Sequence, residues 1–169
     1  YQFNVRETNP TGHTSAATSN FTVIGDTSAP TAIVTTATMP NTGNAEVQST
    51  ETGTAYLVND SVTVSNLASI TGAADNQQKS VAISSANTNT NLAATGLVDG
   101  TYKVYAVDAA GNLSNASSNS VTVDTTAPTV SLVTTTADNQ SSVSITDNIT
   151  VTFSEAMEPS YITTSTSDT

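Results

Sequence analysis

The chain has 169 residues and is acidic, with 14 Asp and Glu against 3 Lys and Arg and a formal net charge of −11. Nucleic acids and anionic membrane surfaces both attract clustered Lys and Arg, so this charge excludes them as partners. No cysteine is present, and no apolar stretch approaches the roughly 20 residues of a membrane helix, so membrane insertion is not expected. Scattered carboxylates favour divalent cations instead.

Short stretches of Val, Ile and Thr alternate with polar residues and predict strands along the whole chain. Turn sequences such as Glu51-Thr52-Gly53 and Asp99-Gly100 separate them, and no window has a helical period. The chain is therefore predicted to be all-β. After two strands in the first 25 residues, the strands are expected at about 31–37, 45–50, 54–58, 61–65, 80–84, 91–95, 101–107 and 119–123.

A repeat divides the chain. Residues 26–31, Asp-Thr-Ser-Ala-Pro-Thr, recur as residues 124–129, Asp-Thr-Thr-Ala-Pro-Thr, with a period of 98 residues. A unit of about 100 residues suits an immunoglobulin-like sandwich and is too long for a solenoid repeat. We expect residues 1–25 to be the closing strands of one module, 26–123 a complete module, and 124–169 the opening of another.

Residues 97–112, Leu-Val-Asp-Gly-Thr-Tyr-Lys-Val-Tyr-Ala-Val-Asp-Ala-Ala-Gly-Asn, carry a family resemblance. They resemble the penultimate strand of fibronectin-III-like and bacterial immunoglobulin-like domains, where Gly-x-Tyr begins the strand and Ala-x-Asp-x-x-Gly-Asn ends it. Tyr102 suits a tyrosine corner, with Val104 and Ala106 on its inward face. With the repeated Asp-Thr-x-Ala-Pro junction, the chain resembles the tandem immunoglobulin-like β-sandwich modules of large bacterial surface adhesins, which are extracellular.

The last segment resembles a different subtype. Residues 147–160, Asp-Asn-Ile-Thr-Val-Thr-Phe-Ser-Glu-Ala-Met-Glu-Pro-Ser, are similar to an immunoglobulin-like subtype of S-layer and adhesin proteins. Residues 124–169 are too few to close a core alone. Either the chain is a trimmed piece, or its partners are neighbouring modules, or successive copies complete one sandwich between them by strand addition.

Calcium at the module junctions is the predicted cofactor, because this cation takes 6–8 oxygen ligands. Asp108, after the penultimate strand, is expected to approach Asp124 in the linker, and Glu7 and Asp26 have the equivalent places at the earlier junction. The resemblance strengthens this expectation, because such adhesins use linker carboxylates to bind calcium and stiffen the array. Further possible oxygen donors are Asn112, Asp99 and Asp147. The alternative is that these aspartates only cap Asx turns.

Enzymatic function is not expected, because the chain lacks the residues for it. The single histidine, His13, has no catalytic partner beside it, and there is no thiol nucleophile. The leading hypothesis is a structural extension segment, a stalk that holds an adhesive tip away from the cell. The alternatives are a module that binds a glycan or a host protein, a spacer of a secreted hydrolase, and a subunit of a strand-exchange filament. An aromatic content of 5% without Trp disfavours sugar stacking.

Overall fold

The computed structural model describes residues 2–3, 10–12, 21–22, 25–135, 144 and 146–157. They belong to two compact units, Tyr1–Thr125 and Thr126–Thr169, which are taken separately below. The first unit begins with a short antiparallel pair, β1 (Gln2–Phe3) with β2 (Phe21–Thr22).

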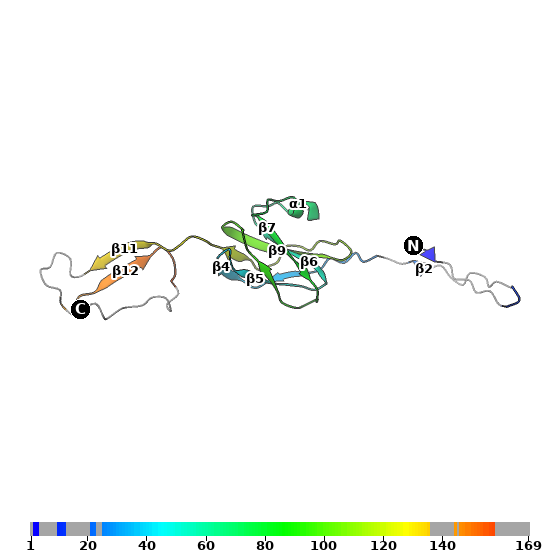
Figure 1. Cartoon of the computed structure of the whole chain (residues 1–169), viewed down its shortest axis with the longest axis horizontal. Helices are drawn as coiled ribbons and strands as arrows, with labels where there is room; N and C mark the ends of the chain where they lie inside the picture. Colours follow the sequence, from blue (N-terminus) through cyan, green and yellow to red (C-terminus); the bar gives the residue numbers. More distant parts are fainter. Residues whose placement is uncertain are drawn as a thin grey trace. The chain divides into compact units, whose positions relative to one another are not determined.

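The rest of the first unit is a two-layer arrangement, here called the sandwich (Figure 1). One sheet has three strands in the order β3 (Ala32–Val34), β5 (Asn44–Ser49) and β8 (Thr90–Ala93). The other has five, in the order β4 (Ala37–Met39), β10 (Val121–Val123), β9 (Gly100–Asp108), β6 (Gly53–Asn59) and β7 (Gln78–Ile83). All neighbours are antiparallel except β4 and β10, which run parallel.

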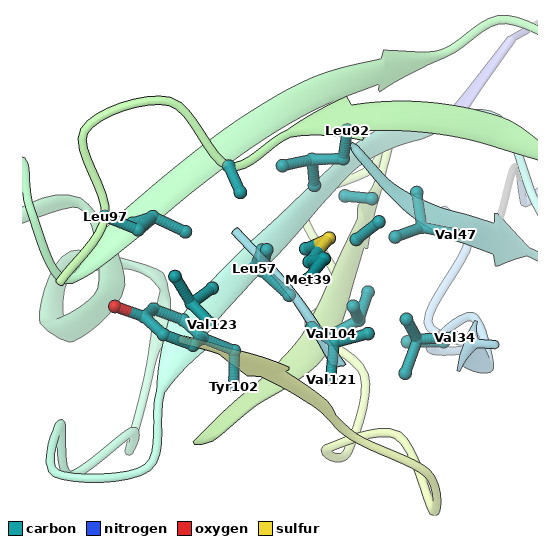
Figure 2. Packing of buried hydrophobic residues seen from close by; sticks show 14 of the residues in the cluster. Val34, Met39, Val47, Leu57, Leu92, Leu97, Tyr102, Val104, Val121 and Val123 are labelled. Carbon is teal, nitrogen blue, oxygen red and sulfur yellow. The ribbon is translucent and has the colours of Figure 1, made fainter. Parts of the chain in front are cut away.

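The core lies between the two sheets, where alternate residues of each strand point inward (Figure 2). Val34 and Val47 come from the three-stranded sheet, and Leu57, Val104 and Val121 come from the five-stranded sheet. All five side chains are almost completely buried. The predicted all-β sandwich is thus confirmed, and most of its core side chains are aliphatic.

Tyr102 is the largest fully buried side chain, and it forms the expected tyrosine corner. Its ring belongs to the core cluster (Figure 2). Its hydroxyl donates to the carbonyl oxygen of Val98 at 2.7 Å, with Asn76 O at 3.4 Å. Val104 and Ala106 are buried on the same side of β9, as the alternation predicts. The corner therefore ties the start of β9 to the turn before it.

Two strand predictions were wrong. The stretch 31–37 is not one strand, because β3 and β4 belong to different sheets and the chain crosses between them at Thr35–Thr36. The stretch 61–65 is not a strand, and it leads into α1 (Leu67–Thr71), so the expectation of no helix was also wrong. A capping box explains the helix: Asn66 Oδ1 accepts from the Ser69 amide, and Ser69 Oγ accepts from the Asn66 amide.

Residues 60–77, between β6 and β7, contain α1 and are called the helical insertion below; α1 lies on the side of the five-stranded sheet away from β5 (Figure 1). Val58 alternates with the inward Leu57, so it belongs to the outer face, yet it is only 1% exposed. Ile70 of α1 is 0% exposed, and neither residue belongs to the main core cluster. Val58 and Ile70 are thus buried outside the main core that lies between the sheets.

The described part of the second unit is an antiparallel pair, β11 (Val130–Thr135) with β12 (Ile149–Phe153). A register shift between Val130 and Leu132 places Val130 opposite Phe153, while Val133 lies opposite Val151. Cross-strand partners share a face, so one face carries five apolar residues. They are Val130, Val133, Ile149, Val151 and Phe153. Four of the five are exposed, as expected for half of a sandwich core.

Candidate functional site

Three carboxylates meet at the end of β9, at the junction that precedes the sandwich. Asp108 is the last residue of β9, and it lies opposite Gly53, the first residue of β6. Glu51 lies two residues before Gly53 in the β5–β6 turn, and Asp26 comes from the segment before β3. One carboxylate oxygen of each lies within 4.8 Å of the other two. These three residues are called the carboxylate cluster below.

Asp108 is held in place by the loop that follows it. Its Oδ1 accepts from the amides of Ala110 at 2.8 Å and Asn112 at 2.9 Å, and its Oδ2 accepts from Asn112 Nδ2 at 2.7 Å. The hydrogen bond from the Asn112 side chain is the main cause of a lowered pKa for Asp108, which burial opposes. Asp108 therefore orders the loop after β9, which is the role that the alternative hypothesis gave it. It remains ionised and faces the other two carboxylates.

Asn112 joins this loop to the linker. Its Nδ2 also donates to the carbonyl oxygen of Asp26 at 3.2 Å, so one amide group bridges β9 and the residue that begins the repeat. Asp26 Oδ1 in turn accepts from the Ser28 amide at 2.9 Å, which is an Asx turn. The Asn112–Asp26 hydrogen bond thus joins the linker backbone to the sandwich, and the Asx turn orders the linker itself.

The predicted pairing of Asp108 with Asp124 is wrong. β10 runs antiparallel to β9, and its last residue, Val123, lies opposite Gly100 at the start of β9. Asp124 therefore leaves the sandwich at the opposite end from Asp108, nine strand residues away. At about 3.3 Å per residue, that separation is far too long for a shared cation. The error lay in placing the β9–β10 loop at the end where the chain leaves the sandwich.

The downstream junction around Asp124 is held by a different set of hydrogen bonds. Asp99, in the turn before β9, accepts from both the amide and the hydroxyl of Thr125, the amide at 2.9 Å and the hydroxyl at 2.6 Å. The Asp124 amide donates to the Met39 carbonyl oxygen at 3.0 Å. Asp99 therefore holds the linker at Thr125 by two hydrogen bonds. The sequence alone suggested only that Asp99 could be an oxygen donor to calcium.

Of the remaining predicted donors, only Asp147 is among the described residues. Asp147 belongs to the second unit, where its Oδ2 accepts from the Ser144 amide at 2.8 Å. Glu7 and His13 lie outside the described residues, so the Glu7 prediction stays a prediction. Glu51 was missed. It was noted only as part of a turn, and nothing local indicates that this turn lies beside the end of β9.

The donor set of the carboxylate cluster fits a hard divalent cation. Calcium prefers carboxylate and carbonyl oxygens, and three carboxylates would supply half of its usual six or more ligands. Neither the Glu51 carboxylate nor the Oδ2 atom of Asp26 takes part in a hydrogen bond to another described residue, although the Glu51 amide donates to Ser49 Oγ. Three like charges this close repel one another, and a bound cation would remove that repulsion.

The lowered pKa of Asp108 predicts a loss of stability in acid. A carboxyl group whose pKa is depressed on folding stabilises the fold above its unfolded pKa, and this contribution is lost as the pH falls through the folded value. With EDTA present, the wild type should lose stability more steeply than Asp108→Asn as the pH falls below the ordinary aspartate pKa of about 4. Urea unfolding at several pH values measures this. If the free energy of unfolding of the two proteins changed in parallel with pH, the lowered pKa of Asp108 would be contradicted.

The second unit has a match among known protein families. Residues 124–169 match the family model of a bacterial Ig-like domain. This supports the resemblance stated for residues 147–160 and, with the two-sheet sandwich, an immunoglobulin-like fold class. Such domains are a non-catalytic type of module. No curated protein and no solved structure matches the chain significantly. Within the described residues, no helix has the length and apolar character to span a membrane.

Proposed function

We propose that the chain is a structural extension segment of a bacterial cell-surface protein of the adhesin kind, with calcium stiffening a junction between its modules. The family match is consistent with a module of a bacterial surface protein. The stalk role rests on the repeated junction sequence with its period of 98 residues and on the short hydrogen-bonded linkers on both sides of the sandwich.

The observation that carries the calcium proposal is the carboxylate cluster. Asp26 belongs to the linker, whereas Glu51 and Asp108 belong to the sandwich, so a cation bound by all three would join the two. In this proposal the ion replaces a repulsion by an attraction at the point where the chain would bend. Asn112 acts as the positioning residue, because its amide orients Asp108 and holds the Asp26 carbonyl.

Calcium should raise the melting temperature of the wild-type chain. A ligand at 100 times its Kd stabilises the folded state by about 2.7 kcal/mol, which corresponds to roughly 10 °C or more for a sandwich of this size. Melting followed by circular dichroism, in calcium and in EDTA, measures the shift. We expect Glu51→Gln to abolish most of it. An unchanged wild-type melting temperature would contradict the calcium proposal and leave the stalk role standing.

The matched control is Glu46→Gln. Glu46 is exposed on β5, where it accepts from Thr35 Oγ1 at 3.1 Å, and it does not belong to the carboxylate cluster. This variant removes the same charge but should retain the full calcium shift. The stability of Glu51→Gln relative to the wild type in EDTA gives a second check. Glu51→Gln should be slightly more stable than the wild type there, by a few tenths of a kcal/mol, because it relieves repulsion.

A further inference from the structure

An open groove lies on the outer face of the five-stranded sheet, away from the carboxylate cluster. Its volume is about 490 Å³. One wall comes from the helical insertion, with Ser65, Asn66 and Leu67, and the other from the β9–β10 loop, with Leu113 and Asn115. Tyr105 lines it from β9, between the inward residues Val104 and Ala106, so its side chain points outward into the groove.

The loop wall is fixed to β9 by two buried serines. Ser114 Oγ accepts from the Ala106 amide at 2.8 Å, and Ser117 Oγ accepts from the Val104 amide at 2.9 Å. The amides of the same serines donate to the carbonyl oxygens of Ala106 and Val104, both at 2.8 Å. The opposite edge of β9 is paired with β6. The groove is therefore preformed, and its floor offers no free strand edge to an extended peptide.

The groove has the chemistry for a neutral polyhydroxylated ligand. One half-buried aromatic ring stands between amide and hydroxyl side chains, and no Asp, Glu, Lys or Arg lines it. Asn115 is exposed, and its side chain makes no hydrogen bond to another described residue. Burial, with a smaller contribution from the negative charge of Asp60, raises the pKa of the Tyr105 hydroxyl, and that nearby charge disfavours an anionic ligand.

We propose that this groove binds a neutral saccharide unit, which stacks on the Tyr105 ring and hydrogen-bonds to Asn115 and Ser65. Pockets that combine a few apolar walls with a small number of fixed polar groups are the usual form of small-ligand sites. The low aromatic content disfavours sugar stacking in general, but the Tyr105 ring alone supplies a stacking surface in this groove. The site does not depend on calcium or on the stalk role.

The test is an amide NMR titration of the whole chain with named neutral disaccharides: lactose, cellobiose, maltose and diacetylchitobiose. At least one should shift the amides of Leu67, Tyr105 and Asn115, with a Kd on the order of 1 mM. Tyr105→Ala should weaken binding about tenfold, whereas Tyr105→Phe, which keeps the ring, should weaken it less. Melting curves of each variant check that it is folded.

Tyr56→Ala is the matched control, because Tyr56 lies opposite Tyr105 on the same outer face but does not line the groove. It should leave the Kd unchanged. The proposal is overturned if none of the four disaccharides shifts the groove amides, or if Tyr105→Ala binds as well as the wild type. It is equally overturned if sialyllactose binds more tightly than lactose, or if only a peptide mixture shifts these amides.

Discussion

Tyr102→Ala is expected to destabilise the sandwich by about 3–5 kcal/mol, the usual cost of removing a buried aromatic ring. Tyr102 is completely buried between the sheets, and its hydroxyl bonds the Val98 carbonyl at 2.7 Å. The substitution removes both the packing and the bond. For a sandwich of about 100 residues, the melting temperature should fall by roughly 15 °C or more, measured by circular dichroism in EDTA.

Two variants separate the contribution of the buried Tyr102 ring from that of its hydroxyl hydrogen bond. Tyr102→Phe keeps the ring and leaves the Val98 carbonyl without its donor, so it should cost about 1–2 kcal/mol. Tyr56→Ala truncates a tyrosine on the outer face and should cost clearly less than Tyr102→Ala. If Tyr102→Ala melted within a few degrees of the wild type, the tyrosine corner would not be a main support of this fold.

Gly53→Ala should be the other severe substitution, at about 2–5 kcal/mol. Gly53 has a φ of +153°, which L side chains rarely adopt. An added Cβ would overlap the carbonyl oxygen of Val107 and lie 2.9 Å from the Cα of Asp108. Both obstacles are backbone atoms of the paired strand, so the clash is relieved only by moving β6 away from β9. Urea unfolding measures the loss.

Gly25→Ala is the control for this prediction, because nothing lies within 4 Å of the added Cβ and its φ is not in the positive region. It should change stability by less than about 0.5 kcal/mol. Gly53→Ala should also weaken calcium binding. Gly53 is paired with Asp108, so moving β6 away from β9 would also move Glu51 away from the Asp108 carboxylate. A Gly53→Ala protein of wild-type stability would show that the β6–β9 register is not as tightly fixed as described.

The strands of the core could be predicted because their pattern is local. Alternation of Val, Leu and Ala with polar residues places β5, β6 and β9 to within a few residues, and Tyr102 is marked by the Gly-x-Tyr sequence before it. Each of these features depends on neighbours in the chain. The burial of Val104 and Ala106 then follows from the period of two.

The errors arose where the structure depends on distant contacts or on too few residues. The crossing between β3 and β4 is decided by pairing with β5 and β10, and residues 31–37 carry no local sign of it. The helix α1 has five residues, too few to show a helical period, although its Asn66 and Ser69 capping box is visible in the sequence.

The candidate site was predicted only in part for a related reason. Asp26, Asp108 and Asn112 were each identified from the repeat and from the strand that they follow, and they lie together. Their grouping was wrong because it depends on strand direction: β10 returns antiparallel to β9, which sends Asp124 to the other end. Glu51 is more than 50 residues from Asp108 in sequence, and only the β6–β9 pairing brings it there.

The two junctions of the sandwich are therefore secured by different chemistry. Downstream, Asp99 clamps Thr125 with two hydrogen bonds, which should hold in any buffer at neutral pH. Upstream, Asn112 holds the Asp26 carbonyl, but three carboxylates repel one another at the same point. In our proposal only the upstream junction responds to calcium, so flexibility should depend on the ion on one side alone.

The central claim is that calcium stiffens the upstream junction, and a distance distribution tests it most directly. Because the chain has no cysteine, Thr22→Cys in β2 and Thr101→Cys in β9 allow two spin labels to be placed on either side of that junction. Double electron–electron resonance should give a broad distribution in EGTA and a narrower one in calcium, with no narrowing in the Glu51→Gln background. Identical widths with and without calcium in the wild type would contradict the proposal.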